Sequence, residues 1–313
     1  MKQLFLTNTL FEYISKYRQQ SKLYGHKDAL KKTYRKLKES KLSASITCRE
    51  ESGNSVKDLP SDMLGFLVYR CNICGTNCKT KAYNLKREEP SCPTCKSTVR
   101  MRAMIHILST ELFGKSLALT DFPKRPDITG IGMSDWREYA VPLAEKLGYK
   151  NTYYHQEPKL DIVSIDRALE GTLDFILSTD VFEHIKPPVS SAFENARKLL
   201  KPGGVMVFSV PYTKGDKTEE HFPELHTYEI VKKENDAILI NITKDGAEQT
   251  FNNLVFHGGD GSTLEMRLFS ESSLMEEFTK AGFNTTRIYK EPHYEFGIVW
   301  ECDWSLPCAA RIK

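Results

Sequence analysis

The amino-acid sequence predicts an α/β fold in which a mostly parallel sheet is joined by helical crossovers and is preceded by a small region of helix and clustered cysteines. Three observations predict it. From about Pro126 onward, short apolar segments alternate with stretches of helical periodicity. Two segments, 173–178 and 205–210, are almost continuously apolar, which is typical of strands buried on both faces of a sheet. Five of the eight cysteines lie between Cys71 and Cys95.

The composition is that of an ordinary globular chain. Its 313 residues suffice for roughly two domains. The hydrophobic share is 40% and the charged share is 27%. No apolar run approaches the roughly 18 residues that a membrane helix needs, so we predict no transmembrane segment. The first residues have too short an apolar core for a signal peptide. We therefore expect a cytoplasmic protein, and the sequence predicts no oligomeric state.

Residues 1–65 are predicted to form a basic helical segment followed by a linker. Apolar residues recur near helical spacing at the start, and residues 43–65 are polar and rich in turn formers. Residues 1–40 carry ten Lys or Arg against three Asp or Glu, an excess of seven. This excess has two alternative interpretations. The first is a solvated helical face. The second is a contact for an acidic partner, such as nucleic acid, membrane headgroups or an anionic glycan.

Residues 66–100 carry a metal-binding pattern. Cys71 and Cys74 form one CxxC pair, Cys92 and Cys95 form another, and 17 residues separate the two. Two such knuckles bring four thiolates together, which predicts a zinc ribbon. Four thiolates leave no open coordination position, so the Zn²⁺ would be structural. Iron in the same geometry and a redox dithiol are the alternatives.

The remaining elements follow in order. Residues 101–125 are predicted to form a connecting helix that stops at Gly114. The sheet region then contains strands at 127–129, 151–155, 173–178 and 205–210, with helices at 136–147 and 190–200. Residues 211–269 interrupt this alternation as an insert, in which two strand-like segments flank Asp245-Gly246 as a hairpin. A helix capped by Ser270 and two final strands at 286–289 and 296–300 complete the chain.

Three blocks point to a family: GIGMSD at 130–135, LDFILSTDVFEHI at 173–185 and ARKLLKPGGVMVFSVPY at 196–212. Together they resemble class I S-adenosylmethionine-dependent methyltransferases over residues 126–313. With the cysteine pairs and the block FHGGDGSTLEMRLFS, the chain looks like bacterial methyltransferases of glycan and small-molecule biosynthesis. The resemblance implies a Rossmann-like sheet of seven strands in the order 3-2-1-4-5-7-6, the seventh antiparallel, with the insert as a substrate cap.

The resemblance also implies S-adenosylmethionine as cofactor and assigns its contacts. The glycine motif would approach the methionine part, and Asp135 would replace the acid that normally precedes the first glycine. Glu157 would accept from the ribose, and the pair at 161–162 would contact the adenine. A solvated turn or a helix cap is the alternative for each carboxylate. The full set is Gly130, Gly132, Ser134, Asp135, Glu157, Asp161, Ile162, Ser178, Thr179 and Asp180.

The chemistry favours oxygen as the methyl acceptor. A hydroxyl nucleophile needs a base, and histidine suits neutral pH. The insert holds three of the eight histidines, namely His221, His226 and His257. Glu183-His184 is interpreted as structural. Enzymes that methylate the amino groups of nucleobases often carry an Asn/Asp-Pro-Pro-aromatic motif after the fourth strand. This chain reads Ser-Thr-Asp-Val there, so the motif is absent, which favours an oxygen acceptor over a nucleobase nitrogen.

We therefore predict O-methylation of a sugar, a glycan precursor or another small metabolite. Two alternatives remain at this point. The first is an RNA-modifying methyltransferase that binds nucleic acid with the ribbon and the basic N-terminus. The second is a non-enzymatic adaptor with a decayed cofactor site.

Overall fold

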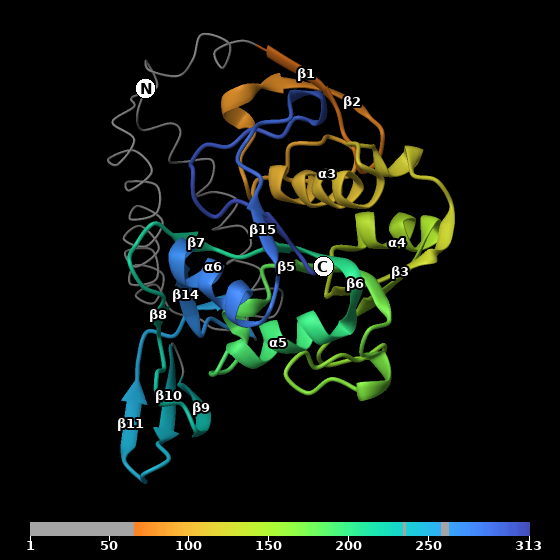
Figure 1. The fold of residues 1–313 in the computed structure, drawn as a ribbon. Coiled ribbons are helices and arrows are strands. Elements are labelled where there is room, and N and C mark those ends of the chain that lie inside the picture. Colours follow the sequence, from red (N-terminus) through yellow and green to blue (C-terminus); the bar gives the residue numbers. More distant parts are fainter. Residues whose placement is uncertain (1–65, 234–235, 258–262) are drawn as a thin grey trace, which may run out of the picture. The chain divides into compact units, whose positions relative to one another are not determined.

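The computed structural model describes residues 66–233, 236–257 and 263–313 (Figure 1). The basic helical segment and linker predicted at 1–65 lie outside the described residues. The chain divides into two compact units. The described part of one is residues 66–223, 255–257 and 263–313, and that of the other is residues 224–233 and 236–254. Within the described residues, no helix is long and apolar enough to cross a membrane.

The larger unit is built on one mixed sheet (Figure 1). Its strands lie in the order β4 (Leu147–Thr152), β3 (Arg125–Met133), β5 (Leu173–Thr179), β6 (Leu200–Ser209), β16 (Cys308–Arg311) and β15 (Thr285–Ile288). The first four strands are parallel, and β16 runs antiparallel to both of its neighbours. This confirms the predicted α/β class, and the order matches positions 2-1-4-5-7-6 of the predicted sheet.

The sheet has six strands in the described residues, and the predicted outermost strand, number 3 in the order 3-2-1-4-5-7-6, is absent from them. The chain between β4 and β5 instead forms turns and the 3-10 helix η4 (Arg167–Leu169). The carboxylates of Asp161 and Asp166 each accept the backbone N–H two residues further on. Such side-chain bonds favour turns over a regular strand, which explains the departure.

Helices cover both faces of the sheet. On one face lie α3 (Val99–Phe113) and α4 (Arg137–Lys146), and on the other lie α5 (Ser190–Leu199) and α6 (Glu271–Lys280) (Figure 1). Successive residues of β5 alternate between the two cores, with Phe175 and Leu177 in one and Ile176 in the other. The predicted cap of α6 is confirmed, because the Ser270 hydroxyl accepts the N–H of Ser273 at 3.1 Å.

The end of the chain differs from the prediction. No strand spans 296–300; the 3-10 helix η6 (Tyr294–Phe296) ends there at Gly297, whose φ of +63° turns the chain out of extended geometry. The last strand is β16 instead, whose two alanines pack in the sheet interior.

The cysteine region belongs to the core of the larger unit. Strands β1 (Phe66–Arg70) and β2 (Asn77–Lys81) form an antiparallel hairpin, followed by η2 (Ala82–Asn84). The fully buried Arg102 of α3 donates to the carbonyl oxygens of Ser97, Phe296 and Gly297 at 2.9–3.0 Å. These bonds tie the cysteine region to the C-terminal part of the chain.

The insert contributes to both units. In the larger unit, β7 (Tyr212–Thr213), β14 (Arg267–Ser270) and β8 (Glu219–Glu220) form one small sheet, and β12 (Phe256–His257) pairs with β13 (Thr263–Leu264). The smaller unit holds β9 (Thr227–Lys233), β10 (Asp236–Ile242) and β11 (Glu248–Phe251). The hairpin predicted around Asp245-Gly246 is confirmed, because β10 and β11 pair antiparallel across it.

Candidate active site

The order in which strands are added to the sheet reverses between β3 and β5, although the two strands are parallel. From β3 the chain moves outward to β4, and it then returns past β3 to β5. Ligands of open α/β sheets bind at the carboxyl ends of the strands at such a reversal. Ser134 follows the end of β3 and Asp180 follows the end of β5. Both have positive φ, 58° and 52°, so the chain turns sharply at both strand ends.

The two predicted glycines lie within β3. A Cβ on Gly130 would lie 2.4 Å from the ring of Phe175, and one on Gly132 would lie 2.0 Å from both the Asp135 carboxylate and the Tyr149 hydroxyl. Both positions therefore need glycine because neighbouring side chains fill the space. Ser134 is exposed at the turn, and its N–H donates to the carbonyl oxygen of Thr152 at 2.7 Å.

Asp135 is enclosed by hydroxyl groups. Its carboxylate accepts hydrogen bonds from Tyr149 at 2.6 Å and from Tyr139 at 2.7 Å, and Thr179 lies at 3.4 Å. Burial raises the pKa of Asp135 to about 6, although the tyrosine hydroxyls oppose that shift. The structure thus brings together two of the predicted cofactor residues, Asp135 and Thr179, and adds two tyrosines that the sequence analysis missed.

Asp180 lies in a cluster of charges. Its carboxylate is 3.2 Å from Arg87 and 3.2 Å from Arg100, and it accepts from the Ser209 hydroxyl at 2.9 Å. Arg100 also donates to Glu88 at 2.7 and 2.8 Å. Burial opposes ionisation of Asp180, but the two guanidinium groups outweigh it and lower the pKa to about 2.

The other predicted cofactor residues make local contacts. Glu157 is exposed and accepts the N–H of Lys159 at 3.0 Å, and Asp161 accepts the N–H of Val163. Ile162 is buried. Ser178 is fully buried, and its hydroxyl has no hydrogen-bond partner in the described part of the chain. Where the structure describes the chain, no hydrogen bond joins Glu157 or Asp161 to Asp135 or Asp180.

Two of the predicted histidines share one carboxylate. His221 Nε2 lies 2.9 Å from Glu265 Oε1, and His257 Nε2 lies 2.5 Å from Glu265 Oε2. The bond to Glu265 raises the pKa of His257. Burial would raise the pKa of Glu265, but the two imidazoles outweigh it and lower this pKa to about 2. The side chain of His257 is 48% exposed and can therefore reach a substrate.

Residues that follow β5 lie against this histidine pair. The ring of His184, in η5 (Phe182–His184), is 5.6 Å from that of His257, and its Nδ1 is 3.0 Å from the carbonyl oxygen of Leu264. Glu183 is buried, and burial together with the Asp180 charge raises its pKa. Glu265 is not among the residues predicted from the sequence, and Glu183 and His184 are predicted there only as structural residues.

His226 belongs to the smaller unit, whereas His221 and His257 belong to the larger one. The backbone N–H of His226 donates to Asn241 Oδ1 at 2.9 Å and its Nδ1 lies 3.1 Å from the Thr227 hydroxyl. No hydrogen bond within the described residues joins it to His221, His257 or Glu265.

A family model described as a methyltransferase domain matches residues 114–288, more than half of the chain. The chain belongs to this methyltransferase family. It is an S-adenosylmethionine-dependent methyltransferase, as the sequence predicted, and thus an enzyme rather than an adaptor. Comparison with curated proteins found no match.

Solved structures resemble this methyltransferase only distantly. A 1,6-didemethyltoxoflavin-N1-methyltransferase from Burkholderia thailandensis, with bound S-adenosylhomocysteine, is 16% identical, with 68% of this chain and 78% of that chain covered and a TM-score of 0.39. A sugar N-methyltransferase from Streptoalloteichus is 12% identical, with 67% and 86% covered and a TM-score of 0.38. Similarities of this size do not assign a substrate.

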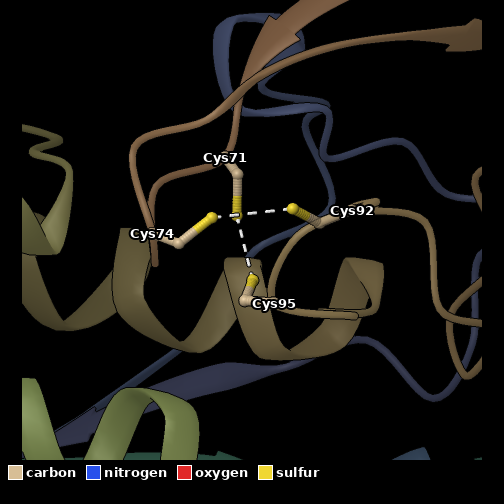
Figure 2. A group of neighbouring side chains, drawn as sticks. All are labelled: Cys71, Cys74, Cys92 and Cys95. Carbon is tan, nitrogen blue, oxygen red and sulfur yellow. Dashed lines mark hydrogen bonds between the residues drawn. The ribbon is translucent and has the colours of Figure 1, made fainter.

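The four paired cysteines of the methyltransferase converge on one point (Figure 2). Their sulfur atoms all lie within 4.8 Å of one another, with Cys71 and Cys95 at 3.6 Å and Cys74 and Cys92 at 3.6 Å. Zn–S bonds of about 2.3 Å in a tetrahedron place sulfur atoms about 3.8 Å apart, so these donors fit a zinc ion. A fifth thiol, Cys78, lies 3.9 Å from Cys92.

Proposed function

We propose that this methyltransferase O-methylates a sugar, a glycan precursor or another small metabolite. The observation that carries the proposal is the histidine pair held by Glu265 beside the segment that follows β5. An imidazole that is hydrogen-bonded to a carboxylate through one nitrogen presents the other nitrogen as a base. A hydroxyl acceptor needs such a base, because it must lose a proton when it is methylated.

His257 is the proposed base. Its Nε2 hydrogen would be donated to Glu265, which leaves Nδ1 free to accept the proton of the substrate hydroxyl. Glu265 would then stabilise the imidazolium. When bound, S-adenosylmethionine supplies the methyl group on a sulfonium sulfur, and the protein has mainly to align donor and acceptor. His221, which is bonded to the other oxygen of Glu265, would hold this carboxylate in place.

The proposed cofactor site lies at the carboxyl ends of β3 and β5. The exposed turn at Ser134 and the polar groups of Thr179 and Asp180 support this position. Asp135 would act indirectly, through Tyr139 and Tyr149, because its carboxylate is enclosed by these two hydroxyls. Glu157, Asp161 and Ile162 remain proposed contacts for the ribose and adenine.

We also propose a structural Zn²⁺ on Cys71, Cys74, Cys92 and Cys95. The distances between the sulfur atoms support it, and the closed set of four donors leaves no position for substrate. Such an ion would fix the β1–β2 hairpin to the start of α3.

The test of the proposed reaction is product analysis. The wild-type chain would be incubated with labelled S-adenosylmethionine and a panel of sugars, sugar nucleotides and hydroxylated metabolites, with methylated products identified by mass spectrometry. We expect an O-methyl product whose formation falls about 100-fold in His257→Gln, within the usual range for a lost general base. His155→Gln, an exposed histidine outside the cluster, is the matched control. An N-methylated product would contradict the proposal.

One observation favours RNA as an alternative substrate. The outer face of the β1–β2 hairpin exposes Phe66 and Val68, at 64% and 66%, beside two lysines. Lys79 Nζ lies 5.0 Å from the Phe66 ring centre and Lys81 Nζ lies 5.5 Å from that of Tyr83. Aromatic rings interleaved with cations suit single-stranded nucleic acid. Salt-sensitive RNA binding that is lost in a Lys79→Glu, Lys81→Glu double variant would favour this alternative.

A further inference from the structure

Two arginines from the cysteine region reach Asp180, at the end of β5 where we place the cofactor. Arg87 follows η2, Arg100 lies in the first turn of α3, and both side chains end at Asp180. Their side chains are only 15% and 12% exposed. The backbone N–H of Arg100 donates to the carbonyl oxygen of Arg87 at 3.2 Å, which holds the two residues side by side. Arg87 Nε also donates to the carbonyl oxygen of Ser305 at 2.8 Å.

The charges of this cluster match those of an amino acid. The methionine part of S-adenosylmethionine carries an ammonium and a carboxylate on one carbon. Asp135, Thr179 and Asp180 can accept hydrogen bonds from an ammonium, but none of them can neutralise a carboxylate. Arg87 and Arg100 can, since a guanidinium presents a planar fork of donors that fits a carboxylate.

A second observation indicates that a hydrogen-bond partner is missing beside Asp180. Glu183, three residues after Asp180, is 2% exposed, and its Oε2 has no hydrogen-bond partner in the described part of the chain. The charges of Asp180, Arg87 and Arg100 all act on this carboxyl group. A buried oxygen without a partner is costly unless a ligand or an ordered water completes it.

We propose that Arg87 and Arg100 bind the α-carboxylate of the cofactor's methionine part, so that the cysteine ribbon completes the cofactor pocket. This inference rests on the proposed cofactor site. The ribbon would then be part of the enzyme's catalytic unit rather than a separate recognition module. Cofactor binding would depend on the ribbon being folded, because the knuckle at Cys92 and Cys95 leads directly into Arg100.

The first arm of the test uses the wild-type full chain. Calorimetry would compare S-adenosylmethionine with its decarboxylated analogue, which keeps the ammonium and lacks the carboxylate. We expect the analogue to bind at least 10-fold more weakly, as for the loss of a hydrogen-bonded charge pair. Equal affinity for the two ligands would overturn the proposal without any variant being made.

The second arm uses Arg87→Gln and Arg100→Gln. We expect affinity for S-adenosylhomocysteine to fall 10- to 100-fold, and affinity for 5′-methylthioadenosine, which lacks the amino-acid part, to stay within twofold. Arg125→Gln, an exposed arginine paired with Asp127, is the matched control. An equal loss for both ligands would mean that the arginines only support the fold, and would overturn the proposal. If the wild-type chain binds neither ligand, the cofactor assignment itself fails.

Discussion

The guanidinium of Arg100 lies 3.2 Å from the carboxylate of Asp180, so the start of α3 is joined to the end of β5 across 80 residues of sequence. This ion pair links the cysteine ribbon to the strand end at which we place the cofactor. Substitution of Asp180 therefore tests whether this ion pair joins the cysteine ribbon to β5.

Asp180→Asn should destabilise the protein in a pH-dependent way. The pKa of Asp180 is lowered to about 2, so its stabilising effect is present above the ordinary pKa of a carboxyl group and is lost as pH falls towards 2. We expect the variant to lose about 2 kcal/mol of unfolding free energy at pH 7 and only about 1 kcal/mol at pH 3. Urea unfolding at both pH values measures this. A pH-independent difference would contradict the ion pair; Asp127→Asn, at an exposed pair, is the control.

Glu265→Gln should change the pH dependence of methyl transfer. The bond to Glu265 raises the pKa of His257, and a general base must be neutral to act, so wild-type activity should rise with pH through a pKa above that of an ordinary histidine. Without the carboxylate, this pKa should fall and the acid limb should move to lower pH. The maximal rate should also drop about 10-fold, because the imidazolium loses its partner. The measurement is kcat/KM against pH, and an unmoved limb would exclude the pairing as a determinant of the base.

Cys92→Ser should remove the proposed metal and destabilise the ribbon. Structural zinc contributes several kcal/mol to folding, so we expect the metal content to fall well below one per chain and Tm to fall by about 10 °C or more. Metal analysis and calorimetry measure the two effects. Cys78→Ser is the matched control, because this thiol lies outside the four paired cysteines. Loss of metal in the control as well would show that Cys78 is a ligand.

Gly132→Ala should destabilise the sheet even though alanine is small. The added Cβ would lie 2.0 Å from both Asp135 and Tyr149, so these buried side chains would have to move. Overpacking of this kind costs about 1–3 kcal/mol. Chemical denaturation measures the loss. Gly215→Ala provides the comparison, because its Cβ would meet only the Thr213 hydroxyl at 3.2 Å. Equal stability of the two variants would contradict the packing at Gly132.

Local signals in the sequence predicted much of the fold. The apolar runs of β5 and β6, the Ser270 cap and the Asp-Gly hairpin each depend on neighbouring residues, and all three are present in the structure. Strand β16 was missed because its two alanines carry little hydrophobic pattern. The outer strand was wrongly expected because the family pattern outweighed the turn-forming aspartates in that segment.

The candidate site was harder to predict, because its partners are distant in sequence. His221 and Glu265 are 44 residues apart, and Arg87 and Asp180 are 93 apart. Arg87 stands in a polar stretch and Glu265 lies between apolar residues; in neither place does the sequence name a partner for the charge, so only the fold shows what they contact. The glycine motif was found for its spacing, yet in the structure both glycines make room for side chains of neighbouring strands and turns.

We place S-adenosylmethionine at the carboxyl ends of β3 and β5, with Arg87 and Arg100 beside it. Hydrogen–deuterium exchange of the full chain, with and without S-adenosylhomocysteine, tests this placement. We expect slower exchange at 130–135, at 157–163, at 178–184 and at 86–101. No protection of 130–135, 178–184 and 86–101 at saturating ligand would contradict this placement.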